Sequence, residues 1–426
     1  MTKNITEKIT LLVPRGKTKT VEGIFELECG LEAEVAVSIH KLNKTHWNQC
    51  VPENNLFLQA EFLGEFEDTA NTHLEFRYVL LRAGNKPAGV LYYQVIHLTA
   101  DEIGYILRPV ASSGSGLAGQ WTEWVRRLRE QKGFRVLISG NNFISGEYGI
   151  AISKNGDPVQ VMDAFAETAK LIAKNDRNPA KISAILVKDY FPGSTKMPVD
   201  RLKKKHFHRF QVEPEMIVPL NKSWITFQDY VNAMSKKYRN RLKMVYKISA
   251  ALKLVEMDES MLRKKQDEIN QLYLNVHRRA KFRLAALGEK YFAGMKAAFP
   301  DKFRVTGYFL ENKLVAFRSS FLTENHLEAH FIGIDYSLNA ELNLYQRILY
   351  DFVSEGILSG VPAVFLGRTA AEIKSTVGAE PHDLVCFIRH RNNFSNQVIR
   401  PFIDYLQPSD WIPRNPFTKT IETVEI

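Results

Sequence analysis

The chain has 426 residues, of which 45% are hydrophobic and 24% charged, and its formal net charge is +10. This composition is typical of a globular protein with a sizeable core, and the length allows two or three domains. The positive charge favours acidic partners, namely a phosphate-bearing cofactor, a nucleic acid or an anionic membrane surface, without choosing among them.

The cysteine pattern and the hydropathy pattern both predict a cytoplasmic protein. Cys29, Cys50 and Cys386 are far apart and odd in number, so they form no disulfide framework and no metal-ligand spacing. The N-terminus has no apolar stretch long enough for a signal peptide, and no run approaches the ~20 apolar residues of a spanning helix. We therefore expect no transmembrane segment and no bound metal.

The chain contains an internal repeat. Residues 74–96 are predicted to form two strands joined by a tight turn at Gly84-Asn85-Lys86. Residues 303–322 repeat this plan, with the turn at Glu311-Asn312-Lys313. The repeated hairpin indicates a duplicated unit.

The elements that follow each hairpin also match. In the first half we predict a strand, a helix, a strand, a helix and a strand at 102–107, 117–133, 134–139, 157–174 and 182–190. In the second half the same order is predicted at 327–336, 342–360, 362–367, 369–378 and 383–390. This alternation predicts an α/β fold with two tandem domains, 1–200 and 201–426, each a mixed sheet flanked by helices.

Between the halves, residues 191–225 are rich in proline and lysine and are predicted to form a linker. Helical patterns follow at 226–252 and at 258–297, where apolar residues recur at helical spacing. The domain boundary predicted near residue 200 is based on this change of composition at 191–225.

A small-residue loop opens the predicted helix at 117–133. It consists of Ser112, Ser113, Gly114, Ser115 and Gly116. Glycines let backbone N–H groups crowd around an anion, and a helix N-terminus adds a positive dipole. The loop therefore predicts a phosphate site, and a flexible connector is the alternative.

These features resemble the GNAT superfamily of acyl-CoA N-acyltransferases, duplicated in tandem as in Fem-type and peptidoglycan biosynthesis or recognition proteins. The resemblance covers about residues 50–400 and implies an acyl-CoA co-substrate. It implies that the 112–116 loop binds the CoA pyrophosphate between two strands that splay apart, a wedge expected in both halves. The loop departs from the family pattern, because Val110-Ala111 stand where the family has glutamine or arginine.

The same resemblance implies roles for the segment after the predicted strand 134–139. The superfamily has an asparagine followed seven residues later by a tyrosine, and here Asn141 and Tyr148 have that separation. Asn141 would contact the acyl-CoA arm, and Tyr148 would protonate the leaving thiolate. Glu147 is the first candidate for the general base. The alternative is that these residues only shape a turn.

In the second half, Arg368 stands in the slot of the asparagine and Ser375 in that of the tyrosine. Arg368 and Lys374 are candidates for gripping an anionic group of the substrate, and a solvated helix face is the alternative. Strand alternation places Glu328 and His330 on one sheet face, as further substrate-binding or acid–base candidates.

A cationic stripe lies in the predicted helix after the linker. It consists of Lys236, Arg239, Lys243 and Lys247, opposite an apolar stripe of Tyr238, Leu242 and Val245. The cations could contact phosphates of a nucleotide-linked precursor, a tRNA acceptor stem or lipid headgroups, or they could face water.

The sequence thus leads to three hypotheses about function. The first is a cytoplasmic acyl-CoA-dependent N-acyltransferase that acts on an amine of a polar metabolite or a cell-envelope precursor. The second keeps the fold but uses aminoacyl-tRNA as the donor, as the Fem-type resemblance implies. The third is a GNAT-like recognition protein without catalytic activity.

Overall fold

The computed structural model of the protein describes residues 21–71, 74–98, 134–176, 178, 180–193, 200–279, 285–398 and 410–418. Its contacts divide the chain into two compact units. Unit 1 consists of Met1–Asp68, Thr72–Val212 and Val385–Gln407, and unit 2 consists of Thr69–Asn71, Glu213–Leu384 and Pro408–Ile426.

The sheet of unit 1 is mixed. Its strands lie in the order β1 (Gly23–Glu26), β2 (Glu32–Ala36), β3 (Glu75–Ala83), β4 (Lys86–Leu98), β5 (Phe134–Ser139), β7 (Ile182–Tyr190) and the end of β14 (Glu380–His390). All neighbours pair antiparallel except β5 and β7, which are parallel. A short strand, β6 (Ile150–Ile152), pairs with β4.

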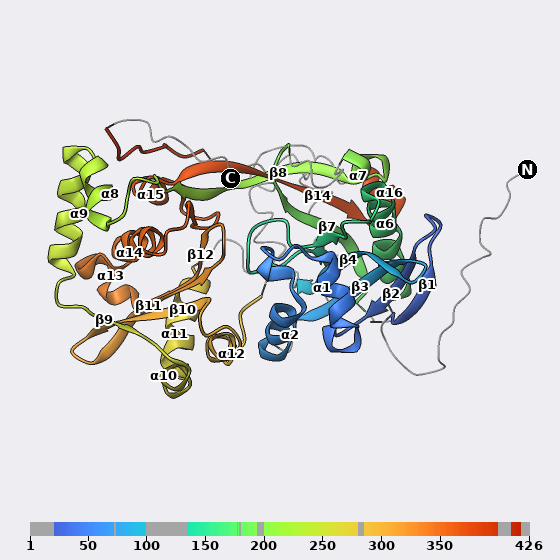
Figure 1. The fold of residues 1–426 in the computed structure, drawn as a ribbon, viewed down its shortest axis with the longest axis horizontal. Helices are drawn as coiled ribbons and strands as arrows, with labels where there is room; N and C mark the ends of the chain where they lie inside the picture. Colours follow the sequence, from blue (N-terminus) through green and yellow to red (C-terminus); the bar gives the residue numbers. More distant parts are fainter. Residues whose placement is uncertain are drawn as a thin grey trace, which may run out of the picture. The chain divides into compact units, whose positions relative to one another are not determined.

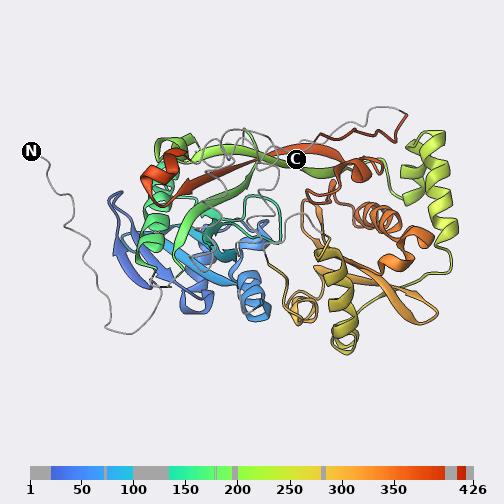
Figure 2. The same ribbon diagram turned by 180° about the vertical axis from the view of Figure 1, so that it is seen from behind.

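Helices cover both faces of this sheet, as Figures 1 and 2 show. Because side chains alternate along a strand, β3 and β4 send one set of residues to each face. Leu91 and Tyr93 pack with residues of α6 (Pro158–Asn175) in one core. On the opposite face, aromatic side chains of β3 contact Trp47 of α1 (Lys44–Cys50) and Phe66 of α2 (Ala60–Thr69).

The sheet of unit 2 has the strand order β8, β13, β12, β11, β10 and β9. The bounds are His208–Pro219, Ala363–Phe365, Leu327–Ile334, Lys313–Leu322, Phe303–Leu310 and Lys253–Glu256. Only β12 and β13 are parallel among these pairs.

Unit 2 also has helices on both faces of its sheet (Figure 1). One core contains residues of α8 (Phe227–Ala233), α9 (Lys236–Ile248) and α14 (Leu344–Leu358). On the other face, aromatic residues of α11 (Gln266–His277) and α12 (Tyr291–Ala298) contact β11 and β12. Shorter helices are α10 (Glu259–Lys264), α13 (Tyr336–Leu342) and α15 (Ala371–Ser375) in unit 2, and α7 (Asp200–Lys204) and α16 (Asn393–Val398) in unit 1.

The predicted fold class is confirmed, because each unit is a mixed sheet flanked by helices. Three predicted elements need correction. The predicted linker 191–225 contains β8, the helical pattern 258–297 is divided among three helices, and the strand at 383–390 pairs with β7 of unit 1 from Val385 on. Within the described residues, no helix combines the length and the hydrophobicity that crossing a bilayer requires.

Candidate functional site

Residues 140–149 of unit 1 form a folded loop of turns rather than a helix. The loop begins at Gly140, whose φ of +114° suits glycine, directly after β5. The Lys188 ammonium on the neighbouring strand β7 donates to the carbonyl oxygens of Asn141 (2.8 Å) and Ile144 (2.9 Å). Lys188 therefore fixes the loop to the C-terminal ends of the two parallel strands, where α/β sheets commonly bind ligands.

The three predicted catalytic residues lie together in this loop. The buried Asn141 accepts a hydrogen bond at Oδ1 from the Phe143 N–H (2.9 Å), while its Nδ2 has no partner in the described residues. Glu147 accepts from the Phe191 N–H (3.1 Å), and the Tyr148 ring packs edge-on against Phe57. These contacts shape the loop, and the catalytic roles remain predictions.

Three further buried residues, Lys188, Asp189 and Gln94, support the loop and were not anticipated. Lys188 forms an ion pair with Asp189, whose backbone has a φ of +61°. Gln94 of β4 accepts hydrogen bonds from the backbone N–H (3.0 Å) and the side-chain amide (2.7 Å) of Asn142. The predicted phosphate loop, residues 112–116, lies outside the described residues.

Unit 2 has an open strand edge beside β13. β12 pairs with β13 at Leu327 and Glu328 alone, and beyond these residues no described strand continues the pairing on that side. A bulge lies opposite Ser319, whose hydroxyl bonds the backbone N–H and C=O of Phe331, both at 3.0 Å. Because their pairing ends at Glu328, β12 and β13 part beyond this residue, as expected for the second half.

A cluster of ionisable side chains, of which Glu215, Glu328 and Lys374 are buried, lies where the strands part. We define the Lys374 cluster as Glu215, His326, Glu328, Arg368 and Lys374. Pairing across β8, β13 and β12 places Ile217 beside Phe365 and Phe365 beside Glu328. Residues of alternate register, Met216 and Leu327 among them, pack into the α14 core, so Glu215 and Glu328 share the other face.

Hydrogen bonds connect this cluster to the loop that follows β13. Lys374 of α15 donates from Nζ to the Gly367 carbonyl oxygen (2.9 Å), and the Gly367 N–H donates to Glu215 Oε1 (2.5 Å). His326 Nε2 lies 3.6 Å from Glu328 Oε2. Glu215 and Lys374 thus bind the backbone N–H and the backbone carbonyl oxygen of Gly367, respectively.

Burial changes the charges that this cluster can carry. It lowers the pKa of the Lys374 ammonium to about 8, although Glu215 and Glu328 act in the opposite direction. Burial also lowers the pKa of His326 to about 4, so this imidazole is neutral near pH 7. The Lys374 amine can therefore exchange its proton close to physiological pH.

The second-half predictions divide into two groups. Lys374, Glu328 and Arg368 interact electrostatically and belong to one cluster. His330 lies apart, with Nε2 2.7 Å from the Tyr291 hydroxyl and aromatic rings around it, and burial lowers its pKa to about 3. Sequence reasoning missed Glu215, because Pro214 beside it disfavours a strand interior.

A shallow pocket lies at the far end of β12, also in unit 2. It is lined by Asn275, Arg278, Arg279, Asp335, Tyr336 and Ser337. The Arg279 guanidinium stacks 3.8 Å from the centre of the Tyr336 ring, and Asn275 donates to the Ile334 carbonyl oxygen (3.2 Å). The exposed Arg278 and the stacked Arg279 make this end of the strand suitable for an anion.

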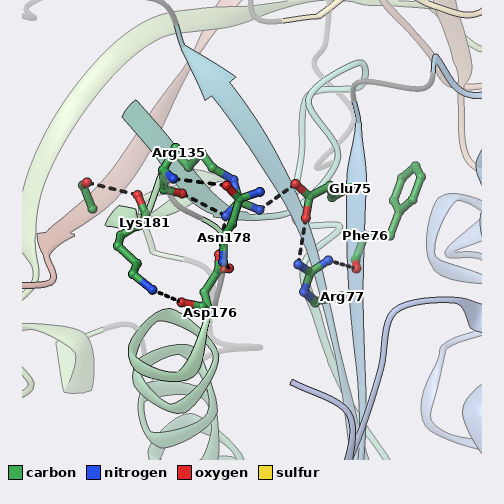
Figure 3. Close-up of polar contacts among 9 residues, drawn as sticks. Glu75, Phe76, Arg77, Arg135, Asp176, Asn178 and Lys181 are labelled. Atoms are coloured by element: carbon green, nitrogen blue, oxygen red, sulfur yellow. Dashed lines mark hydrogen bonds and ion pairs between the residues drawn. The ribbon is translucent and has the colours of Figure 1, made fainter. Parts of the chain in front are cut away.

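A second buried charge network lies in unit 1 (Figure 3). The Arg135 guanidinium at the start of β5 donates to Asp176, to the Ala180 carbonyl oxygen (3.1 Å) and to Glu75 (2.6 Å). Glu75 also accepts from Arg77 (2.8 Å). Each charged side chain has an opposite charge beside it, which is the pattern of a structural network.

No family model matches this chain, and no curated protein matches its sequence. Solved structures with a similar fold include FemX, with 11% identity, a TM-score of 0.49, and coverage of 86% of this chain and 99% of that one. A tandem GNAT protein from the clavulanic acid biosynthesis pathway has 11% identity and a TM-score of 0.46 over 85% and 99%. A GCN5-related N-acetyltransferase from Sphaerobacter thermophilus has 9% identity and a TM-score of 0.38 over 74% and 81%. In each case the likeness is one of fold alone.

Proposed function

We propose that this protein is an N-acyltransferase and that unit 2 carries its acyl-transfer site. The observation that carries the proposal is the open edge of β12, which begins at the Lys374 cluster and ends at the arginine-lined pocket. Ile334 lies six positions after Glu328, which corresponds to about 20 Å of extended strand. An extended thioester donor could lie along this edge, with its phosphates near Arg278 and Arg279.

The chemistry of the cluster fits acyl transfer to an amine. The new C–N bond replaces the C–S bond of the thioester, and the donor leaves as a thiolate. The amine must lose a proton as it attacks the acyl carbon, and a buried carboxylate such as Glu328 can accept that proton. The Lys374 ammonium has three N–H donors, of which Gly367 takes one. A second donor can stabilise the negative charge that develops on the carbonyl oxygen.

The acceptor that this site favours is an amine on a polar, anionic molecule. Arg368 follows β13 and adds positive charge near Lys374. A guanidinium binds carboxylate or phosphate with two parallel hydrogen bonds. A metabolite or a cell-envelope precursor with such a group is therefore the proposed acceptor class.

The test is a binding and turnover assay with the purified full-length chain. We expect saturating acetyl-CoA or a longer acyl-CoA to raise the free energy of unfolding by about 2.7 kcal/mol at 100 times its dissociation constant. We also expect mass spectrometry to detect an acylated product with an amine panel. The proposal fails if no acyl-CoA binds, and binding of aminoacyl-tRNA with steep salt dependence would favour the alternative donor.

A further inference from the structure

Helix α9 of unit 2 has an unusual charge composition. Six of its 13 residues are lysine or arginine, and none is acidic. Lys236, Lys237, Arg241, Lys243 and Lys247 are exposed. No ion pair is found for these five side chains among the residues that the structure describes. The helix therefore presents a concentrated positive charge that no described acid neutralises.

The packing of α9 determines which side chains face outward. Tyr238, Leu242 and Val245 are buried in the unit 2 core, which confirms the predicted apolar stripe. Residues 236, 243 and 247 lie on the opposite side, because offsets of seven and eleven return to the same helix face. The outward face is thus a row of three lysines.

A second row beside these lysines mixes charge with large apolar side chains. Offsets of four, seven and eleven residues place Lys237, Arg241, Met244 and Ile248 on one line. Met244 is 55% exposed and Ile248 is 37% exposed. Moving an apolar side chain out of water lowers the free energy. Met244 and Ile248 therefore favour an apolar environment, although they lie among cations.

We propose that the outward face of α9 docks the protein on an anionic lipid membrane. Lysines beside an anionic bilayer are attracted to the headgroups, while exposed Met and Ile side chains can enter the boundary between headgroups and acyl chains. One partner thereby accommodates both rows of the helix. This docking does not depend on the proposed acyl transfer.

RNA fits the same surface less well. Sequence-tolerant binding of single strands uses aromatic side chains on which bases stack. The two aromatic residues of α9 are not available for stacking, because Tyr238 is buried and Tyr246 donates its hydroxyl to Asp351 (3.0 Å). Bound RNA would also leave the side chains of Met244 and Ile248 exposed to water.

The first experiment measures co-sedimentation of the full-length protein with phosphatidylcholine vesicles, with and without about a third of phosphatidylglycerol. We expect binding to the anionic vesicles only. The variant Lys236→Gln/Lys243→Gln/Lys247→Gln should lose on the order of 100-fold in partition coefficient. A matched control, Lys253→Gln/Lys264→Gln/Lys290→Gln, removes the same charge from exposed positions elsewhere in unit 2 and should lose less than about fivefold.

The second experiment separates lipid from RNA. The variant Met244→Gln/Ile248→Gln keeps every charge and should weaken vesicle binding on the order of tenfold while leaving retention of a mixed-sequence RNA on a filter unchanged. Circular dichroism and thermal unfolding confirm that the variants are folded. The proposal is overturned if the protein binds neutral vesicles equally well, if the control matches the α9 variant, or if the α9 lysines govern RNA retention but not vesicle binding.

Discussion

The two units bury charge in different ways. The Arg135 network of unit 1 surrounds a guanidinium with two carboxylates and a carbonyl oxygen (Figure 3). The Lys374 cluster of unit 2 places one ammonium near two carboxylates and a guanidinium, and burial lowers the pKa of that ammonium to about 8. In the first arrangement Arg77 and Arg135 hold the pKa of the Glu75 carboxyl below its ordinary value, although burial acts in the opposite direction. In the second arrangement burial leaves an ammonium that can lose its proton near neutral pH.

The positions of the two groups agree with this difference. Arg135 is the second residue of β5, at the N-terminal end of the parallel pair β5–β7. Lys374 follows β13, at the C-terminal end of the parallel strand, where open α/β sheets bind ligands. Buried charge alone therefore does not identify a functional site. Its place on the sheet and its freedom to exchange a proton are the better indications.

The largest effect is expected from Arg135→Met. The side chain of Arg135 is 1% exposed and that of Asp176 is 2% exposed, so the variant leaves a carboxylate buried without its cation. We expect the free energy of unfolding to fall by about 3–5 kcal/mol, measured by urea denaturation. Activity per folded molecule should not change.

A matched control is Arg82→Met. Arg82 also contacts two carboxylates, those of Glu32 and Glu34, but all three side chains are partly exposed. Removing a partly solvated pair should cost about 1 kcal/mol or less. If the two variants lose equal stability, burial does not distinguish the Arg135 network.

The second prediction concerns Lys374→Met in the acyl-transfer reaction. The variant keeps most of the side-chain volume but removes the donor proposed for the oxyanion. We expect kcat to fall on the order of 100-fold. The exposed Lys302→Met is the control and should retain full activity. Loss of stability without loss of turnover per folded molecule would mean that Lys374 only supports the Gly367 loop.

The third prediction is a pH dependence. The transfer rate should fall tenfold for each pH unit above about 8, because the Lys374 ammonium loses its proton there. Lys374→Arg should move this fall to higher pH, since a guanidinium stays charged. A rate that rises through pH 8 would instead assign Lys374 the role of a base.

The same pKa predicts a change in stability with a definite sign. The folded-state pKa of Lys374 is about 8, below its ordinary value of 10.5, so the unfolded chain binds more protons between these values. The free energy of unfolding should therefore rise with pH across this window, relative to Lys374→Met. This measurement is independent of any substrate.

The sequence was sufficient for the local elements and insufficient for the contacts that build the site. Both hairpins, 74–96 and 303–322, form at the predicted places as β3–β4 and β10–β11, because alternation and turn residues are local signals. The Lys374 cluster joins residues of β8, β12 and α15 with residues of the loops before β12 and after β13. Glu215 reaches it through β8, which lies in a segment that proline and lysine made resemble a linker.

The strand at the end of the chain shows a second limit. Residues 383–390 have a clear strand pattern, and β14 forms there. Hydropathy does not specify a partner strand, however, and Val385–His390 pair with β7 of unit 1. Pairing over a sequence separation of about 200 residues depends on the whole fold.

The smallest expected effect is that of Tyr148→Phe, which decides between the two units. The variant removes one hydroxyl and keeps the ring that packs against Phe57 at a centroid distance of 5.0 Å. If Tyr148 protonates the leaving thiolate, kcat should fall about 10²- to 10⁴-fold. If transfer takes place at the Lys374 cluster, kcat should stay within about twofold, and this is the result we expect. Because the ring and its packing are preserved, a large loss could not be attributed to unfolding, and it would place the proton donor in the loop of unit 1.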